Sequence, residues 1–249
     1  MDATLIFLVV GIIFLGSLMR AVFGFGDSVV SMPLLALLPL SFSTSVSLVG
    51  LAGFTVAILT VLSGWKEVDR PVLLQLSLAT FIGIPFGLGL VKFAPKILIT
   101  SILSIFLILY GIYSLSNPNL SQSKLGKKLQ GPIGTLPFGF AAGMLGSAYN
   151  MNGIPIVVYG TMRKWNPTVF KETLQAHFLV SSLMIILGHF LGGFWSKELL
   201  ILYGFSLPAI IFAIWLGNFL YGRIPSQKFK RYVFMLIILL GIFLWIDFI

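Results

Sequence analysis

Two short polar stretches interrupt the long apolar runs of this sequence, and they hold the residues whose types could do chemistry. The first is Gly24-Phe-Gly-Asp-Ser-Val-Val-Ser-Met-Pro33, one helical turn after Arg20. The second is Gly146-Ser-Ala-Tyr-Asn-Met-Asn-Gly-Ile-Pro155, 122 positions later. Serine, asparagine and backbone N–H groups donate hydrogen bonds, and the planar fork of an arginine suits an oxyanion. We therefore interpret the two stretches as the halves of one anion site.

Candidate ligands come from both stretches and from one later segment. Arg20 either compensates the charge of the anion or pairs with Asp27. The aspartate has three roles open: a helix N-cap, the partner of Arg20, or a group that takes up a proton. The expected substrate-binding residues are Arg20, Gly24, Gly26, Asp27, Ser28, Ser31, Ser147, Tyr149, Asn150, Asn152, Gln175 and His177.

The two histidines have the weakest claim to a site role. His177 and His189 fall near opposite ends of one apolar segment. A histidine at a helix end is more often a solvated or capping residue, so His189 is left out of the candidate set.

The composition indicates which class of protein must position these residues. Hydrophobic residues make up 58% and charged residues 9% of the 249-residue chain, against roughly 45–50% and about 25% in soluble domains. Uncharged runs long enough to cross a bilayer recur along the chain, so we expect an all-α polytopic membrane protein. The net charge of +9 then reflects basic cytoplasmic loops rather than nucleic-acid binding. With no cysteines and two histidines, we expect no cofactor, no metal and no enzymatic activity.

The apolar runs predict two similar halves. The first half (1–115) and the second half (132–249) are joined by a polar linker at 116–131. Each half is expected to hold a broken-helix or re-entrant hairpin followed by three transmembrane helices. The expected helices are 3–23, 28–40, 44–63, 71–91, 97–115, 132–148, 153–161, 174–193, 198–220 and 231–247.

An internal duplication is suggested by residues that recur at fixed offsets. Gly24 and Pro33 recur 122 positions later, whereas the pairs Trp65/Trp195, Gly87/Gly217, Pro95/Pro225 and Gly111/Gly241 are 130 positions apart. An 11-residue loop at 162–172, against a 3-residue loop at 41–43, accounts for the change. Gly83, Gly87, Gly89 and Gly217 are interpreted as sites of close helix packing.

The charged loops predict that the halves are inverted. If each short segment returns to the face from which its hairpin started, the basic loops 116–131, 162–172 and 221–231 share one face. The positive-inside rule makes that face cytoplasmic, with both termini outside. Inverted repeats with broken helices are typical of transporters that bind substrate near the membrane midplane.

The breaks themselves favour an anion. Gly24 and Gly26 permit a sharp turn, and Asp27 or Ser28 is expected to cap the short helix that follows. Asn150 or Asn152 is expected to cap the corresponding helix in the second half. The N-terminus of each short helix would attract negative charge through its backbone N–H groups and dipole.

Both stretches resemble the two glycine-rich signatures of the TauE/SafE, or sulfite exporter, family. The first match is Gly24-Phe-Gly-Asp-Ser-Val-Val-Ser-Met-Pro-Leu-Leu35, and the second runs from Gly146 to Pro155 and on through Val157-Val-Tyr-Gly160. The resemblance covers essentially the whole chain. It implies transport of sulfite, sulfoacetate or related organosulfonates, often as export, in a bacterial or archaeal cytoplasmic membrane. Many members have further glycines at the positions of Asp27 and Ser28, which leaves the exact substrate open.

We therefore expect a secondary transporter of a small sulfur-containing anion, working by export with protons as the coupling ion. Uptake of another oxyanion or carboxylate, and a passive anion channel, are the alternatives; a membrane-embedded enzyme is the least favoured reading. The expected partners are the small anion, the lipid bilayer and protons, with no nucleic acid. A homodimer remains open.

Overall fold

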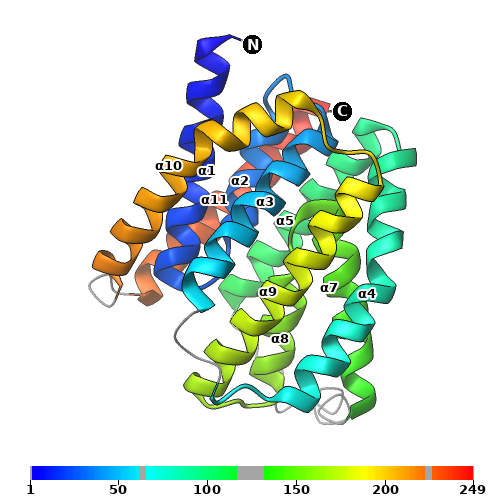
Figure 1. Cartoon of the computed structure of the whole chain (residues 1–249), viewed down its shortest axis with the longest axis vertical. Coiled ribbons are helices and arrows are strands. Elements are labelled where there is room, and N and C mark those ends of the chain that lie inside the picture. Colours follow the sequence, from blue (N-terminus) through cyan, green and yellow to red (C-terminus); the bar gives the residue numbers. More distant parts are fainter. Residues whose placement is uncertain (1, 62–65, 117–131, 222–225, 249) are drawn as a thin grey trace.

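The fold is a bundle of helices in which two short helices lie among long ones (Figure 1). The computed structural model describes residues 2–61, 66–116, 132–221 and 226–248. These residues form α1 (Ala3–Phe23), α2 (Asp27–Ala36), α3 (Phe42–Val61), α4 (Arg70–Phe93), α5 (Lys96–Ser116), α7 (Pro132–Tyr149), α8 (Gly153–Met162), α9 (Pro167–Leu191), α10 (Lys197–Leu220) and α11 (Ser226–Phe248).

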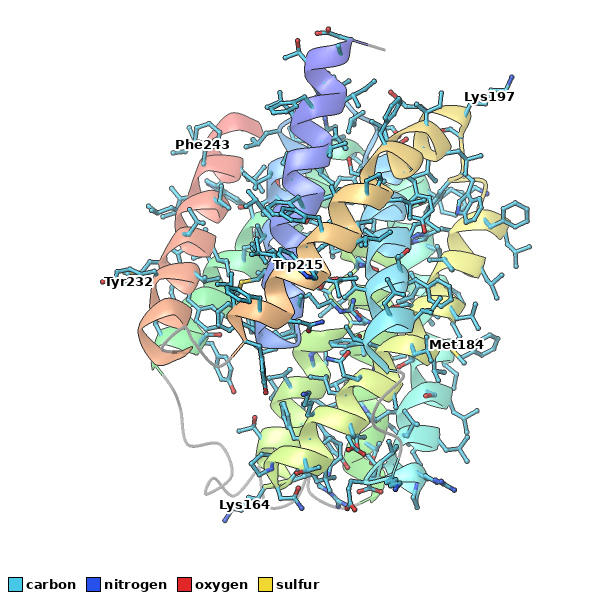
Figure 2. The ribbon with its side chains drawn as sticks, turned by 60° about the vertical axis from the view of Figure 1, so that its left-hand side comes forward. Lys164, Met184, Lys197, Trp215, Tyr232 and Phe243 are labelled. Atoms are coloured by element: carbon cyan, nitrogen blue, oxygen red, sulfur yellow. The ribbon has the colours of Figure 1, made fainter. Side chains whose placement is uncertain are left out.

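Six of these helices are long and apolar enough to cross a membrane, which confirms the predicted class. They are α1, α3, α4, α5, α9 and α10. Figure 2 shows apolar side chains, among them Trp215 and Phe243, projecting outward from the bundle. Trp215 is 63% exposed, and such a surface suits lipid rather than water. The chain is a multi-pass membrane protein.

The two short helices are shorter than the bilayer core. α2 and α8 have 10 residues each, or about 15 Å of rise, against about 30 Å of hydrocarbon. The short segment predicted at 28–40 was too long at its C-terminal end. α2 ends at Ala36, and a turn and bends follow as far as Leu40.

The start of α9 also differs from the prediction. The helix begins at Pro167, not at 174, because Asn166 caps it by accepting a hydrogen bond from the Val169 N–H at 2.9 Å. The predicted 11-residue loop at 162–172 is consequently wrong. The additional residues of the second half lie instead within α9, which has 25 residues against 20 in α3.

The packing of the helices repeats when the two halves are exchanged. α1 packs on α10 as α7 packs on α4, while α3 packs on α9 and α5 packs on α11. At the α5–α11 contact, Gly111 faces Ile238 and the Phe234 carbonyl, and Gly241 faces Ile108 and the Ser104 carbonyl. The residues of this contact form three pairs, each 130 positions apart: Gly111 and Gly241, Ile108 and Ile238, and Ser104 and Phe234. Both glycines of the Gly111/Gly241 pair therefore occupy equivalent places.

Around the breaks the sequence alignment was wrong by one helical turn. α1 ends at Phe23 and α7 at Tyr149, and α2 begins at Asp27 and α8 at Gly153, so both pairs are 126 positions apart rather than 122. Gly24 consequently corresponds to Asn150, and not to Gly146. Both have positive φ, at 83° and 56°.

The ends of the bundle agree with the charge argument. The start of α1 and the end of α11 lie at the same end of the molecule (Figure 1), and Lys164 and Lys197 lie at opposite ends (Figure 2). The inverted relation of the halves, and the assignment of one face to the cytoplasm, stay predictions. So do the repeat boundaries, and residues 117–131 of the predicted linker lie outside the described residues.

Candidate functional site

The first break is a tight turn held by glycines. Gly24 and Gly26 have φ values of 83° and 98°, a region that glycine enters without steric cost. The Gly24 N–H donates to the Arg20 carbonyl at 2.7 Å and thereby ends α1. Gln175 of α9 donates from Nε2 to the Gly24 carbonyl at 2.9 Å. This bond fixes the first break to the second half of the chain.

The second break shares one left-handed position with the first, but its N-cap, Asn152, has φ −60° where Gly26 has φ 98°. Asn150 takes the left-handed position, and its N–H donates to the Gly146 carbonyl at 2.7 Å. Asn152 donates from Nδ2 to Ser181 Oγ of α9 at 2.6 Å. Gly153 then opens α8 directly against the ring of Phe178, which leaves no room for a side chain there.

Neither short helix is capped by a side chain, so the predicted capping roles are wrong. Gly26 is the N-cap of α2, Asp27 is its first helical residue, and no side-chain capping bond forms. Asn152 is the N-cap of α8, again without a side-chain capping bond. Both helices therefore begin without a side-chain acceptor on their first N–H groups.

The structure brings the two breaks together around one cavity. Its walls combine the start of α2, the start of α8 and one ring of α9. The lining residues are Phe25, Gly26, Asp27, Ser28, Val29, Met151, Asn152, Gly153, Ile154 and Phe178. We call this the inter-break cavity. Two helix N-termini from opposite halves thus border the same space, an arrangement that favours a negatively charged ligand.

An ion pair between buried Arg20 and partly buried Asp27 stands beside the inter-break cavity. Arg20 Nη1 lies 2.9 Å from Asp27 Oδ2, and Arg20 is 4% exposed. The guanidinium also lies over the Phe178 ring, 4.6 Å from its centroid. Arg20 Nε and Nη2 have no hydrogen-bond partner among the described residues. Because buried donors without acceptors are costly, this free edge of the guanidinium is suited to a ligand.

Two glycines of α3 make room for this polar group, and the sequence analysis missed them. A Cβ at Gly53 would lie 3.0 Å from Arg20 Nη1, 3.1 Å from Asp27 Oδ2 and 3.3 Å from Asn150 Nδ2. Gly50, one turn earlier, faces Asn150 Oδ1 and His189 Nδ1. The spacing of Gly50 and Gly53 on one face of an apolar helix was the available signal.

Four of the predicted site side chains are not brought to the cavity. Each bonds to a neighbouring helix instead: Ser31 to the Ile12 carbonyl, Ser147 to the Ile84 carbonyl, Tyr149 to the Ile99 carbonyl and His177 to Thr80. Such bonds between helices are a common use of polar residues inside membrane proteins. The break glycines, Arg20, Asp27, Ser28, Asn150, Asn152 and Gln175 do gather around the breaks.

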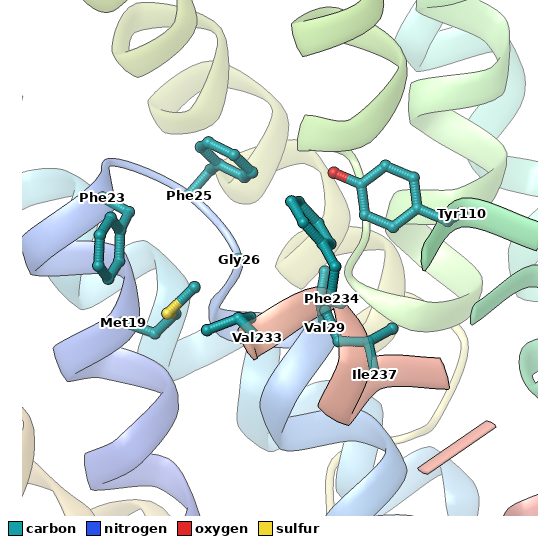
Figure 3. Close-up of a pocket in the computed structure, with 9 residues that line it drawn as sticks. All are labelled: Met19, Phe23, Phe25, Gly26, Val29, Tyr110, Val233, Phe234 and Ile237. Atoms are coloured by element: carbon teal, nitrogen blue, oxygen red, sulfur yellow. The ribbon is translucent and has the colours of Figure 1, made fainter. Parts of the chain in front are cut away.

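A second cavity adjoins the first and is almost entirely apolar (Figure 3). It shares Phe25, Gly26 and Val29 with the inter-break cavity. Its other walls come from α1, α5 and α11. They are Met19, Phe23, Tyr110, Val233, Phe234 and Ile237. We call this the apolar cavity.

No cluster of three or more metal-ligating side chains occurs within the part of the chain that the structure describes.

Comparison with protein families gives the arrangement a context. The family model described as sulfite exporter TauE/SafE matches residues 8–244 of this chain. The chain belongs to the TauE/SafE sulfite exporter family. This confirms the resemblance found in the sequence and makes the chain a membrane transporter protein, consistent with the expectation that it is not an enzyme. Comparisons with curated proteins and with solved structures each find no match.

Proposed function

We propose that this TauE/SafE transporter exports a small sulfur-containing anion across the cytoplasmic membrane of a bacterium or archaeon, coupled to protons. The observation that carries the proposal is that the N-termini of α2 and α8 border one cavity beside Arg20. Two helix dipoles and a guanidinium attract the same charge. Alternating access would expose this site to each side of the membrane in turn.

Arg20 is proposed to bind two oxygens of the anion. Its Nη1 is held by Asp27, while Nε and Nη2 form the edge that has no partner among the described residues. These two N–H groups are parallel, so they match two oxygens of a sulfonate or sulfite in a bidentate arrangement. Ser28 and Asn152 line the same cavity and supply neutral donors.

Asp27 is proposed to carry the coupling proton. An ionised carboxylate at the mouth of an anion site repels the ligand, but it also neutralises Arg20 when the site is empty. Protonation of Asp27 would weaken its bond to Arg20 and leave the whole guanidinium to the anion. Anion binding and proton uptake would then favour one another.

The first test is binding of a panel of anions to the purified protein, measured by thermal shift and calorimetry. Sulfite, thiosulfate, methanesulfonate, sulfoacetate, taurine, sulfate, acetate and chloride would be compared. We expect selective stabilisation by sulfur oxyanions, followed in proteoliposomes by saturable flux that depends on a pH gradient. Equal binding of chloride and acetate would contradict the proposed substrate class, and flux without saturation would point to a channel.

The apolar cavity leads to a second expectation about the substrate. Because it shares walls with the inter-break cavity, we propose that it widens on binding to take the carbon chain of an organosulfonate whose head lies at Arg20. Each methylene buried there contributes about 0.8 kcal/mol, or roughly a fourfold gain in affinity. We expect affinity to rise from methanesulfonate to butanesulfonate and to be weaker for the charged chains of taurine and sulfoacetate.

The control for this series is Ile237→Phe, since Ile237 lines the apolar cavity but not the inter-break cavity. The larger ring is expected to remove the dependence on chain length while methanesulfonate still binds. If the unmodified protein binds methanesulfonate and butanesulfonate with equal affinity, the apolar cavity has no role in substrate binding.

A further inference from the structure

His189 is fully buried in the membrane part of the protein, and one of its nitrogens is left without a partner. Its Nε2 lies 2.9 Å from the Ser147 carbonyl oxygen. A carbonyl oxygen only accepts, so Nε2 carries the hydrogen and donates it. Nδ1 is therefore a bare lone pair, and it has no hydrogen-bond partner among the described residues. Nothing proposed above for the anion site uses this basic nitrogen.

The lone pair of His189 shares a small gap with a second unpartnered acceptor. Asn150 Oδ1 also lacks a partner within the described residues. Both atoms lie 3.7 Å from the place where a Cβ of Gly50 would be. Two buried acceptors that face one gap need a donor between them. A proton on Nδ1, or a water molecule in the gap, satisfies both atoms.

The other end of the Asn150 amide reaches the ion pair. Its Nδ2 lies with Asp27 Oδ2 and Arg20 Nη1 around Gly53, one turn further along α3. Polar groups therefore follow the glycine face of α3 from His189, through Asn150, to Asp27.

The surroundings of His189 supply few other charges. α1 contributes Arg20 and α2 contributes Asp27, whereas α3 contributes only glycines to this group. α7 contributes the Ser147 carbonyl, and α4 brings Ile84 and Leu88 beside the neighbouring Gly188. The Phe194 ring lies 5.5 Å from the imidazole. The charged residues of α4 lie at the ends of that helix, Arg70 in its first turn and Lys92 in its last turn.

We propose that His189 is a second proton-binding group of this transporter, which exchanges a proton with Asp27 along the Gly50–Gly53 face of α3. A proton from water binds the Nδ1 lone pair, and the resulting N–H donates to Asn150 Oδ1. The proton then passes through water in the gap to the Asp27 carboxylate, and His189 returns to its neutral form. Asn150 orients the water and does not itself change protonation state. The inference rests on the proposed function, because it names the coupling route of that same site.

The position of His189 gives the route a direction. It lies two residues before the end of α9, and the charge argument predicts that this end faces outside. Asp27 lies at the break, beside the inter-break cavity. His189 would thus connect the outer aqueous phase with the proton site next to the anion.

The test compares proton flux with anion flux in proteoliposomes that contain an internal pH dye, with methanesulfonate and sulfite as the transported probes. His189→Gln keeps an amide donor for the Ser147 carbonyl but has no nitrogen that titrates. We expect methanesulfonate binding, measured by thermal shift, to stay within about twofold of the unmodified protein. Proton flux driven by the anion is expected to fall at least about tenfold.

Gly50→Ala tests the gap without changing a titratable group. The added methyl makes ordinary contacts of 3.5–3.7 Å with Ile186, Asn150 and His189, so the helix packing is kept while the gap is filled. The same loss of proton flux is expected. Gly204→Ala is the matched control, because nothing lies within 4 Å of its added methyl, and it should behave as the unmodified protein.

The outcomes separate this inference from the proposed function. Full proton coupling in either His189→Gln or Gly50→Ala would overturn the route through His189 and leave the anion site intact. A parallel loss of binding and of both fluxes would show a structural role only, and would also overturn it. If the unmodified protein binds no anion at all, the proposed function itself fails.

Discussion

Replacing Arg20 with glutamine is expected to weaken binding of sulfite and methanesulfonate by at least a hundredfold and to abolish their transport. The variant loses the positive charge and the two N–H groups that have no protein partner among the described residues. Hydrogen bonds to charged groups contribute about 1.5–3 kcal/mol each, so two of them correspond to a hundredfold or more in affinity. Calorimetry with each anion measures this loss.

Stability has to be separated from binding in this experiment. Arg20→Gln leaves the partly buried Asp27 carboxylate without its partner at 2.9 Å, and the cost of breaking a fully buried pair, about 3–5 kcal/mol, is the upper bound. The double variant Arg20→Gln with Asp27→Asn removes both charges and is expected to recover most of the melting temperature. It should still fail to bind. Retained binding in the double variant would mean that Arg20 is only a structural partner of Asp27.

Arg20→Lys distinguishes charge from geometry. Lysine keeps the positive charge but lacks the planar fork, so it cannot offer two parallel N–H groups to two oxygens. We expect binding between that of the unmodified protein and that of Arg20→Gln. If the Arg20→Lys variant bound as tightly as the unmodified protein, the site would need only a charge.

The class of the protein could be predicted from its sequence because a bilayer imposes a simple rule. A helix that crosses it needs about 20 apolar residues, and α1, α4, α5 and α10 begin and end within two residues of the predicted bounds. This rule locates apolar runs, however, and a helix can extend beyond the apolar run that it contains. The first turns of α9 carry Lys171 and Glu172, so hydropathy placed them in a loop although Asn166 and Pro167 form a typical helix start.

The positions of the breaks were also predictable, but their correspondence was not. Matching glycine with glycine paired Gly24 with Gly146, whereas the backbone pairs Gly24 with Asn150. What the turn requires is positive φ rather than a particular residue, and asparagine is the residue that most often replaces glycine there. Identity of residue type was therefore a poorer guide than conformation.

Several residues of the site depend on contacts that only the fold creates. Phe178, Gly50 and His189 come from α9 and α3, far in sequence from Arg20, yet they surround or adjoin its side chain or that of Asn150. Ser147 and His177 were predicted to bind substrate because they are polar, but their side chains form hydrogen bonds to α4 instead. A polar residue in an apolar helix thus indicated burial but not which neighbour it faces.

Helix packing by glycine is a feature of the sequence that the structure bears out for three of the four predicted positions. A Cβ at Gly83 would overlap the Phe140 carbonyl, one at Gly87 would overlap the Met144 carbonyl, and one at Gly217 would overlap Ala21. The prediction was wrong for Gly89, where an added Cβ meets nothing within 4 Å. Close packing therefore belongs to one face of α4.

That face of α4 meets a matching pair of glycines on α7, and the second of these is the most sensitive position of the contact. Gly139 and Gly143 are spaced by four residues, as Gly83 and Gly87 are, which is the arrangement that lets helix backbones touch in membranes. A Cβ at Gly143 would overlap the Thr80 carbonyl oxygen and lie 3.0 Å from the Gly83 Cα. Both obstacles are backbone, so no side chain can turn away to relieve them.

Gly143→Ala is therefore expected to force α4 and α7 apart and to destabilise the protein by about 3 kcal/mol, the upper part of the range for overpacking. For a chain of this size, that corresponds to a fall in melting temperature of roughly 6–12 °C. Thermal unfolding of the detergent-solubilised protein measures it. Gly89→Ala, on α4 itself but with open space around its methyl, is the matched control and should melt at or slightly above the unmodified protein.

The same substitution also tests how the site is positioned. Ser147 lies one turn after Gly143 and donates to the Ile84 carbonyl of α4 at 2.9 Å, and Asn150 begins the break immediately after α7. A shift of α7 away from α4 would move the second break relative to Arg20, so anion affinity should fall together with stability. If Gly143→Ala has the same melting temperature as Gly89→Ala, the α4–α7 contact is looser than described. If it melts lower but binds as before, the second break is held by α9 through Asn152 and Ser181 rather than by α7.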